Sequence, residues 1–180
     1  MAAESSFMKN NLHGSVQGED GTGTPVTLAL AYEKGNIKGG PLADFLNEAI
    51  KIVRRGKLIS VAHGDRFWPK LSFSAFVGNV VGSSAIAPGT PTEFFTKKGA
   101  YSANVSTLGT GRPYAVNVKL TIEGTNFGDA NDETLLFKNF RGLLDFGEGV
   151  EGNEISIDGE VLGDIVVTNG ANTVTYSQVS

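Results

Sequence analysis

RRGKLISVAHGDRFWPKLSFSAFV, residues 54–77, is the most informative stretch of this chain. It opens on a basic turn, Arg54-Arg55-Gly56-Lys57, and continues into an apolar strand pattern and a corner at Asp65 to Pro69 that holds the only tryptophan. Apolar and mostly polar residues then alternate over 70–77, as they do in a strand with one buried face. The stretch therefore indicates a rigid β edge with an adhesive aromatic corner, which favours assembly over catalysis.

The segment just before the basic turn fits two structures. Five apolar residues recur at helical spacing over 41–53, namely Leu42, Phe45, Leu46, Ala49 and Val53. The apolar runs 49–53 and 58–61 on either side of the turn are instead typical of a hairpin. We expect a short helical or irregular entry, followed by the hairpin.

Further strand patterns recur along the chain, separated by turn residues. They cover 26–32, 114–123, 133–146, 154–168 and 172–176. A short helix is predicted at TPTEFFTKKG, residues 90–99, because Pro91 suits the first helical position and Glu93 follows Thr90 at the spacing of a capping box. About eight short strands of this kind predict a mainly β fold, an antiparallel β-sandwich or barrel flanked by a short α-helix.

Length and composition indicate a single domain with an arm. The chain has 180 residues, which suffice for one core, and its 24 glycines suit the many turns between short strands. Residues 1–24 are polar and glycine-rich, and their apolar residues Phe7, Leu12 and Val16 are too sparse to form a core. We therefore expect a flexible N-terminal arm at 1–24 and a β domain at 25–180.

Charge and cysteine content argue against several classes of protein. The net charge is −4 and the basic residues are scattered, whereas a grip on nucleic acid needs clustered Lys and Arg. No run approaches the ~18 apolar residues of a membrane span, and the N-terminus lacks the charged start and apolar block of a secretory signal. Without cysteine there is no disulfide, thiolate nucleophile or cysteine-ligated metal.

Catalytic and metal-binding patterns fail when they are tested on this sequence. Ser60, His63 and Asp65 are the residue types of a hydrolase triad, but neighbours on one strand and its turn cannot converge as a triad does. The loop from Asp129 to Glu133 begins like a calcium-binding loop, but Thr134 stands in place of the turn glycine. With two histidines in all, a His-rich metal site is not available. The sequence predicts no enzyme, no catalytic residue, no metal site and no cofactor.

What remains is a set of aromatic residues without catalytic neighbours. Two pairs stand out, one at the corner after Asp65-Arg66 and one on the short helix. Because adjacent residues on a helix point in different directions, the helical pair cannot easily bury against one core surface. Either one ring of each pair closes the core while the other covers a loop, or one faces a neighbouring subunit. The candidate subunit-interface residues are Asp65, Arg66, Phe67, Trp68, Phe94 and Phe95.

The order of the segments is itself informative. A strand ending in Tyr-Glu-Lys-Gly-Asn-Ile (32–37) precedes the basic hairpin, and Gly64-Asp65 and Pro69 precede the Leu-Ser-Phe-Ser-Ala-Phe strand. The short helix, Val105-Ser-Thr, the 118–124 strand with its acidic loop, and Asp145-Phe-Gly-Glu-Gly149 with Asn153 follow before a terminal hairpin. In order and texture, residues 26–170 resemble the major tail tube protein of tailed bacteriophages, a family without a catalytic motif.

This resemblance implies a β-sandwich flanked by a helix, whose copies close into hexameric rings that stack into a hollow tube. It implies self-association and contacts with tape-measure, tail terminator and baseplate or tail-tip proteins, in the virion tail after synthesis in the host bacterial cytoplasm. DNA passes through such a lumen without specific binding, and no membrane takes part. Because an acidic wall repels phosphates, we expect Asp and Glu to outnumber Lys and Arg there.

Two other classes stay open on the sequence alone. A virion decoration protein or other accessory β-domain has a similar composition and exists as a trimer or monomer. A carbohydrate-binding or hydrolytic β-sandwich needs an exposed aromatic platform or paired carboxylates about 5–10 Å apart, and the sequence offers no convincing pair.

Overall fold

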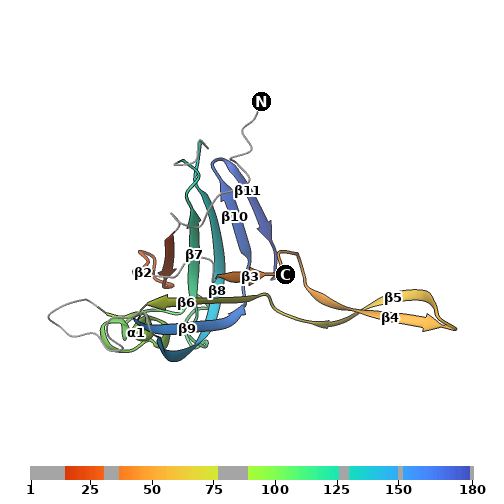
Figure 1. The fold of residues 1–180 in the computed structure, drawn as a ribbon, viewed down its shortest axis with the longest axis horizontal. Helices are drawn as coiled ribbons and strands as arrows, with labels where there is room; N and C mark the ends of the chain where they lie inside the picture. Colours follow the sequence, from red (N-terminus) through yellow and green to blue (C-terminus); the bar gives the residue numbers. More distant parts are fainter. Residues whose placement is uncertain (1–14, 31–36, 77–88, 126–129, 150–151, 179–180) are drawn as a thin grey trace.

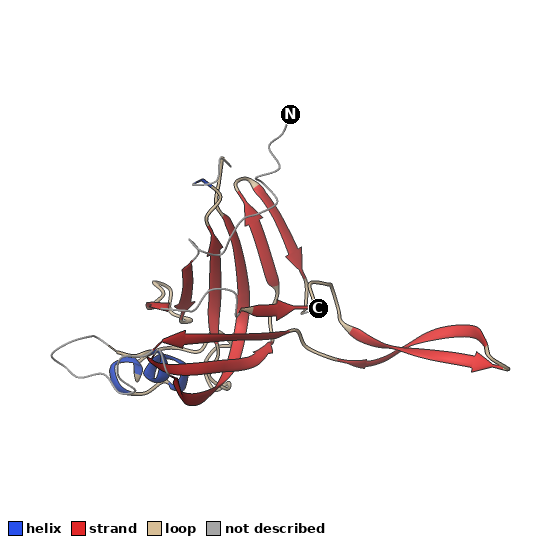
Figure 2. Cartoon of the chain, viewed as in Figure 1, coloured by secondary structure: helices blue, strands red, loops and turns tan. Residues whose placement is uncertain are grey.

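The computed structural model describes residues 15–30, 37–76, 89–125, 130–149 and 152–178. These residues form eleven strands, one α-helix and one 3-10 helix, so the mainly β fold with a short flanking helix is confirmed (Figure 2). The elements are β1 Ser15–Glu19, β2 Thr27–Leu30, β3 Lys38–Gly40, β4 Asn47–Arg54, β5 Lys57–Arg66, β6 Lys70–Phe76, α1 Pro91–Thr96, η3 Gly99–Tyr101, β7 Val116–Ile122, β8 Glu133–Gly149, β9 Gly152–Val161, β10 Ile165–Asn169 and β11 Asn172–Tyr176.

One antiparallel sheet contains nine of these strands. Its order is β2-β1-β7-β8-β9-β6-β3. Outside this path, β10 pairs with residues 133–137 at the start of β8, and β11 pairs with β10. The 17-residue β8 belongs to two layers, because its first part pairs with β7 and β10 while its second part pairs with β9. Asn139 has a φ of 56°, beside a register shift in the β7–β8 pairing, as at a β-bulge. There β8 turns from the upright strands in Figure 1 into the layer of β6 and β9.

The core lies between these two layers and under α1. Phe73 from β6 and Phe140 from β8 are buried, and both rings contact Phe95 of α1, with centroids 6.2 Å away in each case. The neighbouring Phe94 is fully buried as well, and its centroid lies 5.5 Å from that of Phe95. The expectation that two adjacent helical rings cannot share one core is therefore wrong.

Local packing explains how both helical rings fit. Tyr101 from the following 3-10 helix covers Phe94, with ring centroids 5.1 Å apart and nearly perpendicular. On the β1 side, Gly18 leaves the space that Phe94 needs, since a Cβ at Gly18 would lie 2.5 Å from the ring. The helix itself begins as predicted, because Thr90 and Glu93 form a complete capping box ahead of Pro91.

The N-terminal boundary of the domain differs from the expected one. Residues 15–19 were assigned to the arm, yet they form β1, which lies between β2 and β7. Val16 is 1% exposed and belongs to the core, so its isolation in the sequence was misleading. A short strand can contribute one buried side chain and still be fixed by the hydrogen bonds of two neighbours. Residues 1–14 and 31–32 of the predicted arm and first strand lie outside the described residues.

Asp20, directly after β1, joins three segments of the chain. Its carboxylate accepts hydrogen bonds from the Thr22 hydroxyl at 2.8 Å and from the backbone N–H groups of Val26 and Val105 at 2.7 and 3.1 Å. Burial raises the pKa of Asp20, but the hydrogen bonds outweigh burial and hold that pKa below its ordinary value. The side chain is 2% exposed, and each of these bonds is partly buried.

We expect Asp20→Asn to lower the free energy of unfolding by about 1–3 kcal/mol at neutral pH, because a buried acceptor becomes a misplaced donor. Since the folded-state pKa is depressed, this stabilisation is present above the unfolded pKa of about 4 and is lost as pH falls through the folded pKa. Urea unfolding at several pH values measures the effect. A difference between the two proteins that stays constant from pH 7 to pH 2 would contradict it.

Among the described helices, none is long and apolar enough to cross a membrane.

Candidate assembly surfaces

The hairpin of β4 and β5 projects from the body of the molecule (Figures 1 and 2). It forms a separate two-stranded sheet, and all eight residues of β4 are exposed. Its tip is a two-residue turn in which Arg55 and Gly56 both have positive φ, 50° and 77°, as type I′ turns require. The hairpin was predicted at this position, and the ambiguous segment before it is irregular from residue 41 to 46.

Large apolar side chains lie exposed along the whole hairpin. Six of them are 49–59% exposed: Ile50, Ile52, Val53, Leu58, Ile59 and Val61. An isolated two-stranded hairpin is at best marginally stable in water, and patches of exposed aliphatic side chains mark interaction surfaces. Beyond the contacts of Arg66 at the root, no described element packs extensively on either face of this hairpin. Its surface is therefore suited to burial against another molecule.

The root of the hairpin, residues 43–46 and 66–69, is held firmly on the body. The Arg66 guanidinium lies 4.4 Å from the Trp68 ring centroid and 5.8 Å from that of Phe45, which are cation–π distances. The backbone N–H of Ser177 donates to Asp44 at 2.6 Å, and the Gln178 side chain donates to the Ala43 carbonyl at 2.5 Å. These contacts fix the direction in which the hairpin projects from the body.

The structure separates the six candidate interface residues into two groups. Asp65 and Arg66 end β5, and Phe67 and Trp68 form the corner that leads into β6; Phe67 remains 41% exposed. Phe94 and Phe95 are 0% and 7% exposed. The core of the chain itself accounts for both helical rings, which leaves almost no surface of either one for a neighbour.

A second exposed surface is the face of the β6–β9–β8 layer that points away from α1. The register places Lys70, Glu160 and Arg141 in one row, followed by Ser72, Asp158 and Leu143 in the next. Farther along, Asp145 and Glu154 are also on this face. Four carboxylates and two cations give the face a net charge of −2, and no described element covers it.

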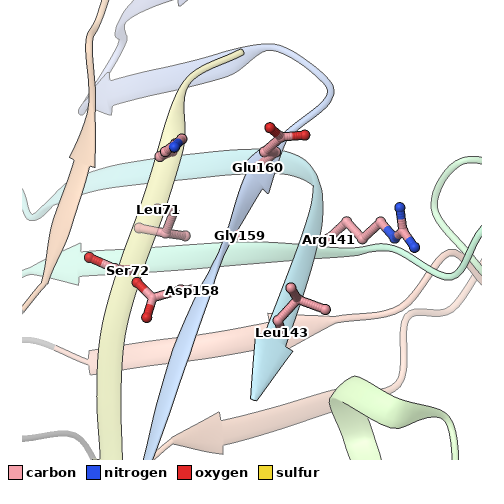
Figure 3. Close-up of a pocket in the computed structure, with 8 residues that line it drawn as sticks. Leu71, Ser72, Arg141, Leu143, Asp158, Gly159 and Glu160 are labelled. Atoms are coloured by element: carbon pink, nitrogen blue, oxygen red, sulfur yellow. The ribbon is translucent and has the colours of Figure 1, made fainter. Parts of the chain in front are cut away.

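A groove of about 480 Å³ lies on this face, lined by the first two of these rows. Figure 3 shows the Asp158 carboxylate beside Ser72, while the Arg141 side chain extends away from both. Leu143 is 72% exposed. The groove offers mixed charges on an open surface, without the enclosed apolar walls that hold small ligands.

The same layer has free edges on both sides. Residues 141–149 of β8 pair with β9, but the pairing of β7 with β8 ends at Phe140. On β6, the short β3 pairs with Lys70 to Ser72, and no described residue pairs with 73–76 on that side. Within the described part of the chain, both edges present unpaired backbone N–H and C=O groups, which are templates for pairing with another chain.

The structure does not support the catalytic and calcium-binding patterns that were rejected on the sequence. Ser60, His63 and Asp65 all lie exposed on β5 of the projecting hairpin, where the only described strand beside them is their hairpin partner β4. Asp132 accepts hydrogen bonds from Gly124 and Thr125 and so closes its own loop. Asp129 lies outside the described residues. Within the described residues, no three metal-ligating side chains lie in reach of one ion.

Comparison with known proteins gives likenesses of structure only. No known protein family and no curated protein matches the sequence. Among solved structures, the chain is similar to the sheath/tube terminator of the extracellular contractile injection system PVC in its extended state, with 7% identity and a TM-score of 0.49 over 92% of this chain and 94% of the other. No residue role in this chain follows from a likeness at this level.

Two further solved structures are similar in the same way. A chain of the anti-feeding prophage baseplate has 10% identity and a TM-score of 0.43, with 93% of this chain and 94% of that chain covered. A chain of the SPP1 tail tube has 12% identity and a TM-score of 0.45, with 96% of this chain and 80% of that chain covered.

Sequence reasoning found the hairpin and its corner but missed the acidic face and the free edges. The acidic face has a partial sequence signal in the alternation of polar residues along β6 and β9. In β9, Asp158 and Glu160 point to one face of the strand, and the buried Ile155 and Ile157 point to the other. The free edges have no sequence signal, because they depend on where β7 and β3 stop pairing.

Proposed function

We propose that this chain is a structural protein of a virion tail, which self-assembles into stacked hexameric rings that form the tube for phage DNA. The observation that carries the proposal is the β6–β9–β8 layer, an acidic face that no described element covers, bounded by two strand edges that are unpaired among the described residues. The proposed protein is not an enzyme and needs no cofactor. Its further partners, by the sequence resemblance, are tape-measure, terminator and baseplate or tail-tip proteins.

Ring closure follows from pairing between unlike edges. If the 73–76 edge of one copy pairs with the 141–149 edge of the next, every copy uses two different surfaces, and the contact is heterologous. A heterologous contact closes into a ring when the rotation per copy divides a full turn, and six copies need 60° each. The layers of successive copies then form one continuous barrel without edges.

The uncovered face of the layer lines the lumen in this proposal. Its four carboxylates, Asp145, Glu154, Asp158 and Glu160, exceed its two cations, Lys70 and Arg141. Around a ring of copies this excess repeats on every subunit and repels the phosphates of DNA, so the duplex slides without being held. The opposite placement, with the hairpin surface in the lumen, would direct aliphatic side chains and basic groups at DNA.

The hairpin and its corner form the second contact between copies. Residues Asp65 to Trp68 lie where the hairpin leaves the body, so a neighbour that covers the hairpin also approaches Phe67. We keep these four residues as interface candidates. Phe94 and Phe95 are assigned to the core because of their burial.

Electron microscopy of the purified chain tests the proposal directly. Negative staining is expected to show rings with six-fold end views or hollow tubes, and light scattering after size exclusion is expected to give multiples of six chains. Isolated small particles at every concentration, monomeric or trimeric, would overturn the proposal and favour an accessory β-domain. In a reconstruction of the tube, a lumen wall with more Lys and Arg than Asp and Glu would contradict the proposed acidic lumen but not the proposed tube.

A further inference from the structure

We propose that Gln178 couples the β4–β5 hairpin to the bend in β8 at Asn139, so that the angle between the two layers sets the direction of the hairpin. The inference rests on the proposed function, in which one layer lines the lumen and the hairpin contacts another copy. It deepens that function by linking these two surfaces. The coupling itself lies within a single chain, so it is measured without assembly.

The hairpin needs a second attachment because both of its legs leave the body at one place. β3 ends at Gly40 and β6 begins at Lys70, and these two residues are paired. An attachment at a single place leaves the direction of the projecting segment open. The second attachment lies at 43–45, which Figure 1 shows beside the end of β11. There the backbone N–H of Phe45 donates to the Ser177 carbonyl at 3.0 Å, in addition to the root contacts described above.

Gln178 is the buried part of this second attachment. Its side chain is 0% exposed, its Nε2 donates to the Ala43 carbonyl, and its backbone N–H donates to Asp164 Oδ1 at 2.9 Å. Its Oε1 has no hydrogen-bond partner among the described residues. A buried polar side chain with an unmatched oxygen favours folding less than an apolar side chain of similar size. Gln178 is therefore better suited to fixing the position of two segments than to adding stability.

From Asp164 the hydrogen bonds continue to the bend. The link from β9 to β10 lies on the bend, because the N–H of Leu162 donates to the Asn139 carbonyl and the N–H of Lys138 donates to the Asp164 carbonyl, both at 3.1 Å. Asn139 has its φ of 56° at this point, and its N–H donates to the side chain of Asn117 on β7 at 3.1 Å. Hydrogen bonds and short stretches of backbone thus connect β7, the bend and the hairpin.

The length of the hairpin amplifies any change at its root. The eight residues of β4 span about 27 Å, so a rotation of about 10° at the root moves the tip by about 5 Å. A contact between copies requires a defined direction, and the apparent affinity falls in proportion to the fraction of chains that have it. A change at the bend that is too small to disturb the core therefore alters assembly.

Energy transfer between two dyes measures the direction of the hairpin. The chain contains no cysteine, so Lys57→Cys at the tip and Thr173→Cys on β11, both exposed, provide the labelling sites. Single-molecule measurement at sub-nanomolar concentration keeps the chains separate. Gln178→Met retains a side chain of similar size and removes the Nε2 donor. It is expected to broaden the distance distribution about twofold or more and to leave the melting temperature unchanged or raised. A packing role would instead lower the melting temperature and leave the distribution narrow.

A second variant opens the attachment without changing a buried group. Asp44→Ala removes the acceptor of the Ser177 N–H at an exposed position, and it is expected to broaden the distribution in the same way. Glu48→Ala, also exposed and on β4, is the matched control and is expected to leave the distribution unchanged. Equal broadening by Asp44→Ala and Glu48→Ala would show that this attachment does not hold the hairpin.

A double-mutant cycle tests the coupling to the bend. Asn117→Ala removes the acceptor of the Asn139 N–H on β7, outside the hairpin and its root, and it is expected to shift the mean distance between the dyes. In the Gln178→Met background it is expected to cause no further shift, because non-additivity of this kind is the signature of coupled positions. Gln17→Met, at a half-buried position of β1, is the control for Gln178→Met and is expected to change neither the mean nor the width.

The outcomes separate this inference from the proposed function. Additive effects of Asn117→Ala and Gln178→Met would overturn the coupling and leave the proposed function standing, as would a distribution that stays narrow and unshifted in both variants. A distribution as broad in the unmodified chain as in Gln178→Met would also overturn it. If the labelled variants behave as expected but the unmodified chain forms neither rings nor tubes, the proposed function fails while the coupling within the chain holds.

Discussion

The double variant Ile50→Ser, Ile52→Ser is expected to remain folded and to form tubes only at a much higher protein concentration. Both side chains are about half exposed on the free hairpin, so their removal costs the single chain little. Full burial of an isoleucine is worth about 1.5–3 kcal/mol, and the exposed half supplies on the order of 1 kcal/mol or more per residue at the contact. Two residues then change the critical concentration by roughly 30-fold or more, at 1.4 kcal/mol per tenfold.

Sedimentation over a range of protein concentrations measures this change, with negative staining to confirm the product. Val174→Ser is the matched control, because Val174 is equally exposed, at 53%, but lies on β11. An assembly threshold that responds to Val174→Ser and not to the hairpin changes would show that the hairpin is not a contact surface.

Phe140→Ala is expected to have the largest effect on stability. The ring is 0% exposed and lies where β8 passes between its two layers, 6.3 Å from Phe73 and 6.2 Å from Phe95 between centroids. A large cavity in such a position costs about 3–5 kcal/mol, a major part of the 5–15 kcal/mol typical of a folded domain. Thermal and urea unfolding of the unassembled protein measure the loss.

Leu143→Ala, three residues along the same strand, is the control for Phe140→Ala. Leu143 is 72% exposed, and changes at such positions usually stay within about 0.5 kcal/mol. Similar losses from both substitutions would mean that the layers do not meet at Phe140 as described.

Several elements of this fold could be predicted because their signals are local. The capping box of Thr90 and Glu93 fixes the start of α1, and the basic turn with Gly56 fixes the hairpin. The alternation of Val116, Val118 and Leu120 gives β7 its buried face. In each case the residues that carry the signal also make the contacts, so no information from distant segments is needed.

The features that escaped prediction depend on distant contacts. β1 has one buried aliphatic residue, Val16, and is recognisable only from the two strands that flank it. Phe94 and Phe95 share the core because Gly18, far away in the sequence, leaves room for the Phe94 ring, and Tyr101 of the following 3-10 helix covers that ring. The candidate assembly surfaces divide in the same way: the hairpin was visible in the sequence, whereas the free edges exist only where other strands stop.

The contacts at the hairpin root also bear on the order of events during folding. They join residues 43 and 44 to residues 177 and 178, which are 133 and 135 positions apart in the chain. We expect contacts of such long range to form late, because the entropy of closing the intervening loop must be offset first by the rest of the sheet. The exposed aliphatic hairpin therefore acquires its direction only after the body has folded. A nascent chain in which the root is still open presents its adhesive strands without the geometry needed to join a growing assembly, which separates folding from polymerisation in time.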